Sequence, residues 1–291
     1  MHRAYKRNMP IRAGGKALLL IDTQVDFTTG SLAVPGAERD AEGTAKLVRD
    51  GPWNEIYVTL DTHQRYHVAH PVFWHDREGN HPKPFQTITA ADFRNGTWMP
   101  VDNTKSTLDW CSFYLQSLQE LKKQLTIWPE HCLVGSTGGC VEPHILAALL
   151  EWEGKTGGTV VYVHKGANSF TEHYSAFKAE VPRPDDPTTD LNVDLIHDLL
   201  KHDNVTVCGQ ALSHCVGSSV ADLADNWDQS RLKDIILMEN LTSPVPGFEA
   251  AGESYVASFR KRGITITTYD FKSKRRSLPG APSQLEGCTM C

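Results

Sequence analysis

The feature that most constrains this chain is a regular alternation of short apolar runs with helical patterns. Runs of β-branched and aliphatic residues, each bounded by polar or turn residues, predict strands over residues 17–21, 55–60, 159–163, 205–208, 234–238 and 264–268. Helical patterns separate these runs, over residues 37–48, 108–125, 142–153, 191–201, 216–226 and 248–261. Strands that alternate with helices predict an α/β fold, a three-layer, doubly wound, mainly parallel sheet with helices on both faces.

Two stretches interrupt the alternation. Residues 61–107 are rich in His, Pro, Asp and Gly, and residues 166–190 contain several prolines. Long connections within a compact domain are usually functional loops or insertions. We therefore expect one domain over residues 16–270, with loop insertions near 74–125 and 166–190 and tails at 1–15 and 271–291.

The composition excludes several classes of protein. The 291 residues carry a net charge of −6 without a basic stripe, which argues against nucleic acid as a partner. The longest aliphatic runs, 17–21 and 145–150, are far shorter than the roughly 20 residues that span a bilayer, so we expect no membrane segment. The N-terminus is basic but lacks the apolar core of a secretory signal.

The seven cysteines show no disulfide framework, and their odd number rules out complete internal pairing. A reducing compartment explains this usage most simply, and we expect a cytoplasmic protein. Cys288 and Cys291 form a Cys-x-x-Cys pair, but no strand precedes it and no helix follows, so we interpret it as part of a frayed terminus.

Reactive side chains follow the carboxyl ends of four predicted strands. Asp22 follows the first, Asp61 ends the second, Lys165 lies just beyond the third, and Cys215 lies shortly after the fourth. In an open parallel sheet, ligands bind outside the carboxyl ends of the strands. The sequence therefore predicts that these side chains meet at one edge of the sheet.

Cys215 is the candidate nucleophile. Its predicted position in the first turn of a helix favours the thiolate, since backbone N–H groups are free there and the helix dipole attracts an anion. A nearby Lys165 would lower the thiol pKa further, and Asp22 could accept the proton. Taken singly, Cys215 also fits a small buried apolar residue, Asp22 a turn cap and Lys165 a solvated lysine. Their convergence on one edge favours the catalytic interpretation.

A candidate metal site begins at Asp61 and His63. Residues i and i+2 of a strand point the same way, and a carboxylate with an imidazole suits Zn²⁺, Fe²⁺ or Mn²⁺. A third ligand is available from a separate loop in His131. The alternative is a solvated loop rich in histidine, since the segment after the Asp-x-His pair also contains His67, His70 and His75.

The sequence resembles a known family, the nicotinamidases among the isochorismatase-like cysteine hydrolases. Five motifs occur in the family's order over roughly residues 16–270. They are Ile21-Asp22-Thr23-Gln24-Val25-Asp26-Phe27 with Gly30-Ser31-Leu32-Ala33-Val34-Pro35-Gly36-Ala37, then Asp61-x-His63, Trp128-Pro-x-His131-Cys132, His164-Lys165-Gly166 and Gly209-x-Ala211-x-x-x-Cys215-Val216.

The resemblance implies a role for each matched residue. The family's catalytic triad maps to Asp22, Lys165 and Cys215. Its metal ligands map to Asp61, His63 and His131, and the fourth ligand fits His70 best, in His70-x-x-Phe73, with His67 as the rival. The implied cofactor is one divalent transition metal, with zinc first and iron or manganese as the alternatives.

The resemblance also implies how the substrate is held. Phe27 and Trp128 match the aromatic side chains that sandwich a pyridine ring. A cis peptide is implied before Ala211, and the backbone amides of Ala211 and Cys215 would form the oxyanion hole. The implied reaction is the metal-dependent hydrolysis of nicotinamide, a small-molecule amide, to nicotinate and ammonia through a thioester, a step of NAD salvage.

The chain departs from the family at two places. Val25 stands where Asn is usual, and Leu212-Ser213-His214 replace Thr-Asp/Glu-Tyr. The insertions could also reshape the pocket mouth or an oligomer interface, so a homo-oligomer remains open.

The alternative functions are those of a related amidase or hydrolase with another substrate and no metal, and of a non-catalytic binding module. Dinucleotide binding is disfavoured, because no Gly-x-Gly-x-x-Gly follows the first strand.

Overall fold

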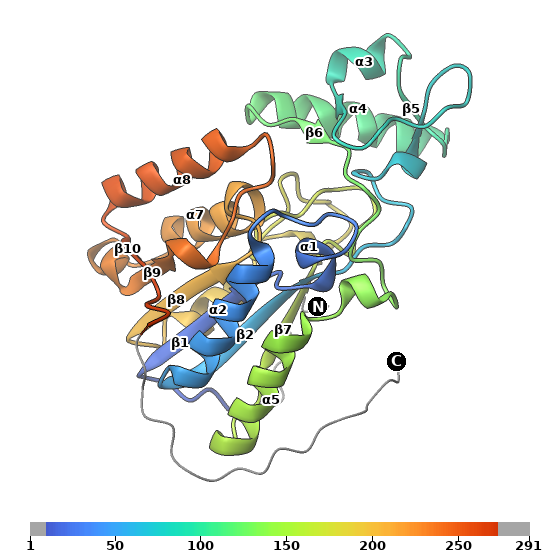
Figure 1. Ribbon diagram of the computed structural model, residues 1–291. Coiled ribbons are helices and arrows are strands. Elements are labelled where there is room, and N and C mark those ends of the chain that lie inside the picture. The colour runs from blue at the N-terminus through green and yellow to red at the C-terminus, as the bar shows by residue number, and fades with distance from the viewer. Residues whose placement is uncertain (1–9, 273–291) are drawn as a thin grey trace.

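The structure is a computed structural model that describes residues 10–272. At its centre lies a six-stranded parallel sheet in the order β10-β9-β8-β1-β2-β7 (Figure 1). Its strands are β1 (Lys16–Ile21), β2 (Trp53–Asp61), β7 (Val161–Lys165), β8 (Asn204–Gly209), β9 (Ile235–Met238) and β10 (Thr265–Thr267). The six strands expected from the sequence are confirmed, although the third begins at 161 and not at 159.

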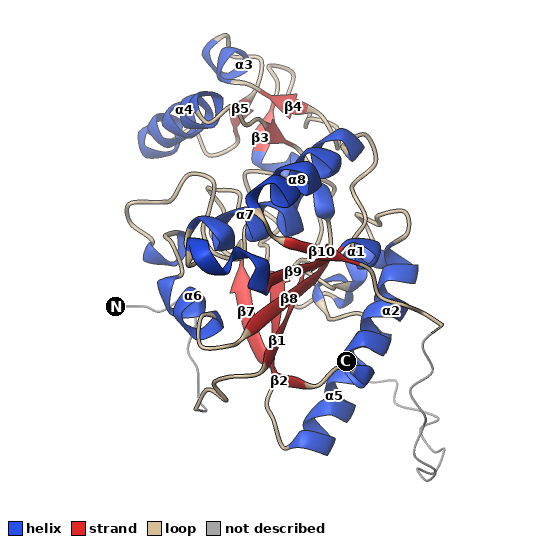
Figure 2. Cartoon of the chain, turned by 90° about the vertical axis from the view of Figure 1, so that its left-hand side faces the viewer, coloured by secondary structure: helices blue, strands red, loops and turns tan. Residues whose placement is uncertain are grey.

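Helices cover both faces of this sheet, which confirms the predicted three-layer α/β class (Figure 2). One face carries α2 (Ala37–Asp50) and α5 (Pro143–Thr156), and the other carries α6 (Val193–Leu199), α7 (Gly217–Asp225) and α8 (Glu249–Arg262). Along β1, Leu18 and Leu20 pack on the first face, whereas Leu19 and Ile21 pack on the second. A strand buried on both faces needs apolar residues at every position, which explains the continuous run in the sequence.

The strand order reverses direction next to β1. From β1 the chain adds β2 and β7 toward one edge of the sheet, then returns to add β8, β9 and β10 toward the other. Ligands in such sheets bind in the crevice at this reversal, outside the carboxyl ends of the strands. Gly209 ends β8 with a φ of 125°, and a Cβ there would lie 2.0 Å from the Ile21 carbonyl oxygen. Only glycine therefore permits the close approach of β8 to β1 at the crevice.

The first insertion, near 74–125, is folded, and it contains more elements than the one helix that the sequence predicted there, over 108–125. It contains η1 (Pro71–Phe73), β3 (Trp74–His75), β4 (Thr87–Ile88), α3 (Ala90–Arg94), β5 (Met99–Pro100), α4 (Lys105–Glu120) and β6 (Leu125–Thr126). Two antiparallel pairs, β3 with β5 and β4 with β6, tie it together. Each pair joins strands of two residues that are far apart in the sequence, so periodicity could not reveal them.

The folded insertion lies beyond the carboxyl ends of the central strands (Figures 1 and 2). Its Trp74 and Tyr114 are fully buried and share one apolar cluster with Phe27 and Ala211 at the edge of the sheet. The second insertion, 166–190, is mostly irregular and includes η3 (Pro187–Thr189). The remaining helical turns are α1 (Val25–Thr28), η2 (Thr137–Gly139), η4 (Leu212–Val216), η5 (Gln229–Asp234) and η6 (Glu239–Leu241).

Over residues 10–272, no helix is long and apolar enough to cross a membrane. The cysteines of that range are all free, namely Cys111, Cys132, Cys140, Cys208 and Cys215. The Cys288-x-x-Cys291 pair and most of the two expected tails lie outside the described residues.

The central strand allows a direct test of the core. Leu19→Ala should lower the free energy of unfolding by about 2–5 kcal/mol, because the Leu19 side chain is fully buried and the cavity left behind cannot collapse completely. Leu150→Ala, at a helix position that is 58% exposed, should change it by less than about 0.5 kcal/mol. Urea unfolding followed by circular dichroism measures both, and similar losses would contradict the assigned packing of β1.

Candidate active site

The ammonium group of Lys165 is the centre of the candidate site. Asp61 and Lys165 are direct partners on neighbouring strands, so their side chains point to the same face. Lys165 Nζ lies 2.7 Å from Asp61 Oδ1, 2.8 Å from Asp22 Oδ2 and 3.6 Å from Cys215 Sγ. It also donates to the His173 carbonyl oxygen at 2.9 Å. The structure thus brings together the three residues of the expected catalytic group.

Burial and charge give these groups different proton affinities. Burial raises the pKa of Asp22, and Lys165 only partly offsets this effect. Burial acts in the same direction on Asp61, but attraction to Lys165 and then to His63 holds the Asp61 pKa well below its usual value. Burial lowers the pKa of Lys165, yet the carboxylates of Asp22 and Asp61 raise it well above its usual value. Lys165 therefore stays charged, Asp61 stays ionised, and Asp22 is the carboxylate suited to exchanging a proton.

Cys215 differs from the sequence prediction in two respects. It lies in the π-helical turn η4, ahead of α7, where the Val216 amide donates to the Ala211 carbonyl at 3.1 Å. Its pKa is raised well above the usual value, not lowered, because burial disfavours the thiolate and the Lys165 charge only partly compensates, with Asp22 and Asp61 adding to the rise. Cys215 is therefore a resting thiol that must lose its proton when it attacks.

Three side chains converge as a group that could hold a metal ion. One ligand atom from each of Asp61, His63 and His131 lies within 4.8 Å of the others, and all three residues are buried. His63 Nε2 is 3.4 Å and His131 Nε2 is 3.9 Å from Asp61 Oδ2. Each imidazole places Nδ1 against a backbone carbonyl, at Gly166 for His63 (2.9 Å) and at Pro129 for His131 (2.8 Å).

This hydrogen bonding suits metal ligation. A carbonyl that accepts from Nδ1–H leaves the Nε2 lone pair of the same ring free to bind a cation. His63 Nε2 is buried and has no hydrogen-bond partner among the described residues. Burial lowers the pKa of His131 to about 3, so this imidazole is neutral at neutral pH. One carboxylate and two imidazoles fit a divalent transition metal such as zinc, iron or manganese.

The other two candidate histidines lie next to this group. His70 Nε2 is 3.4 Å from Nδ1 of His131, and the ring centres of His70 and His63 are 5.4 Å apart. The ring centre of His67 lies 4.3 Å from that of His63 with the two rings tilted by 51°, and His67 Nε2 is buried without a partner among the described residues. The fourth ligand stays a prediction for both. His75 instead lies in β3, where its Nδ1 contacts a backbone carbonyl.

The reactive groups face a small cavity of about 20 Å³. The residues expected to bind substrate line it together with the reactive ones, namely Phe27, Trp128, Ala211, Asp61, His131 and Cys215. The peptide bond before Ala211 is cis, as the resemblance implied. A cavity of this size holds about one water molecule, so an aromatic amide can enter only if part of the wall moves.

Three wall residues were missed by the sequence reasoning, namely Glu172, Tyr174 and His214 as lining groups. They also border an outer groove of about 290 Å³ between the insertion and α8, so they separate the groove from the cavity. Burial raises the pKa of Glu172 to about 7, and its Oε2 has no partner among the described residues. His214 packs at ring distances of 5.0 Å from Trp128 and 5.1 Å from Tyr174. No periodic pattern marks Glu172 and Tyr174 in the second insertion, and His214 stood out only as a departure from the family's motif.

Two further residues position the site. The Gln24 side chain accepts from the Asp61 amide (2.7 Å) and donates to the Asp61 carbonyl (2.8 Å). It thus makes with the Asp61 backbone the two hydrogen bonds that a neighbouring strand would make. Asp26 Oδ2 accepts from the Cys132 amide at 2.7 Å and so anchors the loop that carries His131. Both residues belong to the motif that follows β1, and this is the feature of the sequence that could have identified them as positioning residues.

Comparison with known proteins finds solved structures with a similar fold but no matching family model. No protein-family model matches the chain, and no curated protein matches it. An Acinetobacter baumanii nicotinamidase and pyrazinamidase is 18% identical, with a TM-score of 0.59 over 88% of this chain and 96% of that one. The yeast nicotinamidase is 21% identical, with a TM-score of 0.60 over 86% of this chain and 98% of that one.

A third similar structure is the Pyrococcus horikoshii pyrazinamidase in complex with zinc, 17% identical with a TM-score of 0.50 over 87% of this chain and 99% of that one. At these identities the likeness establishes the fold. The fold is therefore that of nicotinamidases and pyrazinamidases, as the sequence resemblance predicted.

Thr59 offers a test of how the site is held. Its hydroxyl donates to Asp22 Oδ1 (2.6 Å) and accepts from the Asp22 amide (3.0 Å) in the buried interior. Thr59→Val should lower the free energy of unfolding by about 1–3 kcal/mol, because it leaves that amide without a partner. Thr59→Ser keeps the hydroxyl and should cost only about 1 kcal/mol for the lost methyl group. Equal losses in urea unfolding would contradict the assigned hydrogen bonds.

Proposed function

We propose that this protein is a cysteine amidohydrolase that converts nicotinamide to nicotinate and ammonia. The observation that carries the proposal is the contact of Lys165 Nζ with Asp22, Asp61 and Cys215, of which Asp61 and Cys215 line one small cavity. A carboxylate that can take up a proton, next to a buried thiol and a fixed cation, is the arrangement that nucleophilic attack on an amide requires.

Asp22 and Cys215 carry out the bond changes. The Asp22 carboxylate takes the thiol proton as Cys215 Sγ attacks the amide carbon, and Lys165 stabilises the developing thiolate. The backbone amides of Ala211 and Cys215 receive the oxyanion, and one such donor is worth about 3 kcal/mol. Asp22 then donates its proton to the departing nitrogen, the C–N bond breaks, and ammonia leaves a thioester on Cys215.

Hydrolysis of the thioester completes the cycle. Water attacks the thioester carbon while Asp22 accepts a proton from it. The C–S bond then breaks, nicotinate forms, and the proton returns from Asp22 to Cys215. The raised pKa of Asp22 suits this repeated exchange, because a group that binds a proton more readily is the better base.

We further propose that Asp61, His63 and His131 hold one divalent metal ion, with zinc as the first choice, and that His70, or in its place His67, completes the set. Such an ion supplies a Lewis acid that can anchor the ring nitrogen of a pyridine. Phe27 and Trp128, which line the cavity, orient the ring between their faces. The zinc bound in the P. horikoshii relative supports this choice.

The setting of the reaction follows from the same proposal. Hydrolysis of nicotinamide is a step of NAD salvage, and we place it in the cytoplasm. The free cysteines over residues 10–272 support a reducing compartment.

His214, one of the departures from the family pattern, lies in the cavity wall, so it is the residue to vary when related amides are compared as substrates.

The direct test is ammonia release from nicotinamide, with and without a chelator. The wild-type protein should release ammonia, and the chelator should suppress the release. Cys215→Ala should lower the rate by at least about 10³-fold with an unchanged circular dichroism spectrum, because the nucleophile is lost. Cys140→Ala, at an exposed free cysteine, should keep full activity.

Three outcomes would each overturn one part of this proposal. Ammonia release that survives Cys215→Ala would exclude the thioester mechanism. Activity that the chelator leaves intact would exclude the metal dependence. If the wild-type protein hydrolyses another small amide and leaves nicotinamide untouched, the cysteine chemistry stands and the substrate assignment fails.

The metal assignment has its own measurement. Purified protein should contain about one equivalent of a divalent transition metal by elemental analysis. His131→Ala should remove most of that metal, because it deletes one of the three convergent ligands. His144→Ala, at a side chain that is 73% exposed, should leave the metal content unchanged. Equal metal content in both variants would contradict the site.

A further inference from the structure

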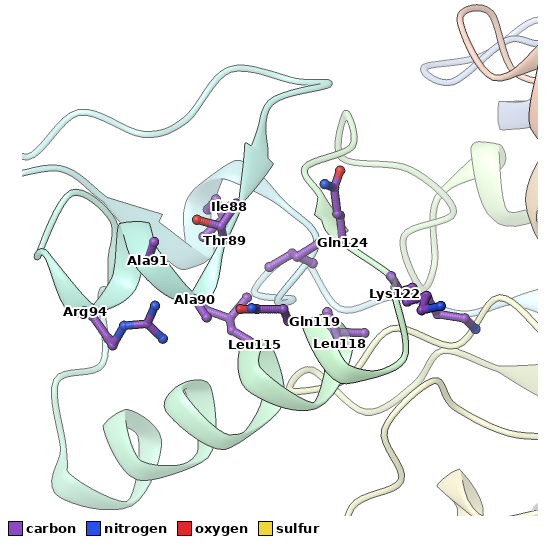
Figure 3. Close-up of a pocket in the computed structure, with 12 residues that line it drawn as sticks. Ile88, Thr89, Ala90, Ala91, Arg94, Leu115, Leu118, Gln119, Lys122 and Gln124 are labelled. Carbon is purple, nitrogen blue, oxygen red and sulfur yellow. The ribbon is translucent and has the colours of Figure 1, made fainter.

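A second cavity lies in the first insertion and shares no lining residue with the reaction cavity. It measures about 480 Å³ and opens between α3, α4 and the β4–β6 pair (Figure 3). Its floor is apolar and buried, and it consists of Ile88, Ala90, Leu115, Leu118 and Leu125. The second cavity shares Leu118, Lys122, Lys123, Gln124 and Leu125 with the outer groove, so it adjoins that groove without sharing a residue with the reaction cavity.

The rim of this cavity is cationic. Arg94, Lys122 and Lys123 line it together with the amides of Gln119 and Gln124, and its lining contains no carboxylate. The chain as a whole has a net charge of −6, so the rim is a local cluster of positive charge on an acidic protein.

Two of the three rim cations are available to a ligand. Lys123 already pairs with Glu180, at 3.3 Å. Over residues 10–272, neither Arg94 nor Lys122 forms an ion pair through its side chain. The nearest acid on α3, Asp92, is engaged in the capping box with Thr89 at the start of that helix. Figure 3 shows the guanidinium of Arg94 on the side of α3 that faces α4.

We propose that this cavity binds a small organic acid with an apolar body and one anionic head. The apolar body would rest on the leucine floor, since burial of apolar surface is worth roughly 25 cal/mol per Å². Figure 3 shows Arg94 and Lys122 at opposite ends of the cavity, so the anionic head would meet one of these two cations, with Gln119 or Gln124 as a further donor. The volume lies within the range of small-molecule sites, roughly 300–1,000 Å³.

The proposal does not rest on the amidase function. Pockets for small molecules pair an apolar lining with a few placed polar groups, and this cavity has both. An anionic head is favoured over a neutral one because the rim offers exposed cations and no carboxylate.

The test uses 8-anilinonaphthalene-1-sulfonate, an aromatic sulfonate whose fluorescence rises in an apolar environment. The wild-type protein should bind about one equivalent saturably, and rising salt should weaken the binding because the rim contacts are exposed. The double variant Arg94→Gln/Lys122→Gln removes both possible partners of the head and should raise the Kd by about fivefold, since one exposed ion pair contributes up to about 1 kcal/mol. Octanoate should displace the probe, because it has the same combination of apolar body and anionic head.

Control variants separate this site from other apolar surfaces. Lys83→Gln removes an exposed charge from the same insertion outside the cavity, and it should leave the Kd unchanged. Ala91→Trp should abolish binding, because Ala91 lines the cavity and a large ring would fill it. The circular dichroism spectrum and the melting temperature of each variant show whether it is folded.

Three results would overturn the proposal. They are the absence of saturable binding, an unchanged Kd in a folded double variant, and displacement of the probe by nicotinamide, which would place the probe in the reaction cavity. Each result is independent of ammonia release, so failure of the amidase assay and failure of this site are distinguishable.

Discussion

The buried ammonium of Lys165 is the interaction on which the rest of the site depends. It lies between the carboxylates of Asp22 and Asp61, and every partner is buried. Either carboxylate alone would be costly to bury as an anion, and two close together would repel each other. The cation makes the arrangement possible, and it holds the ends of β1, β2 and β7 in one relative position.

The same contact links the two halves of the site. Asp61 offers Oδ1 to Lys165 and Oδ2 to the imidazoles of His63 and His131, so one carboxylate belongs to both groups. The environment lowers the pKa of Asp61 and raises that of Asp22. Two carboxylates of the same type thereby take different parts, one as a permanent anion and one as the group that exchanges protons.

Much of the fold could be predicted because its signals are local. The run 17–21 is apolar at every position, which a strand covered on both faces requires, and β8 follows the same logic, whereas the edge strand β7 exposes Tyr162. The insertion could not be predicted in this way. The pairing of Ile88 with Leu125 depends on a contact between distant segments, and strands of two residues carry no periodicity.

By itself, the sequence determined which residue types follow each strand, and with a parallel sheet this was enough to place Asp22, Asp61, Lys165 and Cys215 at one edge. Only the tertiary structure decided their chemical state. Burial raises the pKa of Cys215, where the expected helix position had suggested a lower one. It also decided which side chains close the cavity, since Tyr174 and His214 come from segments that no local pattern brings together. Burial and proximity are properties of the packed chain, and residue spacing does not contain them.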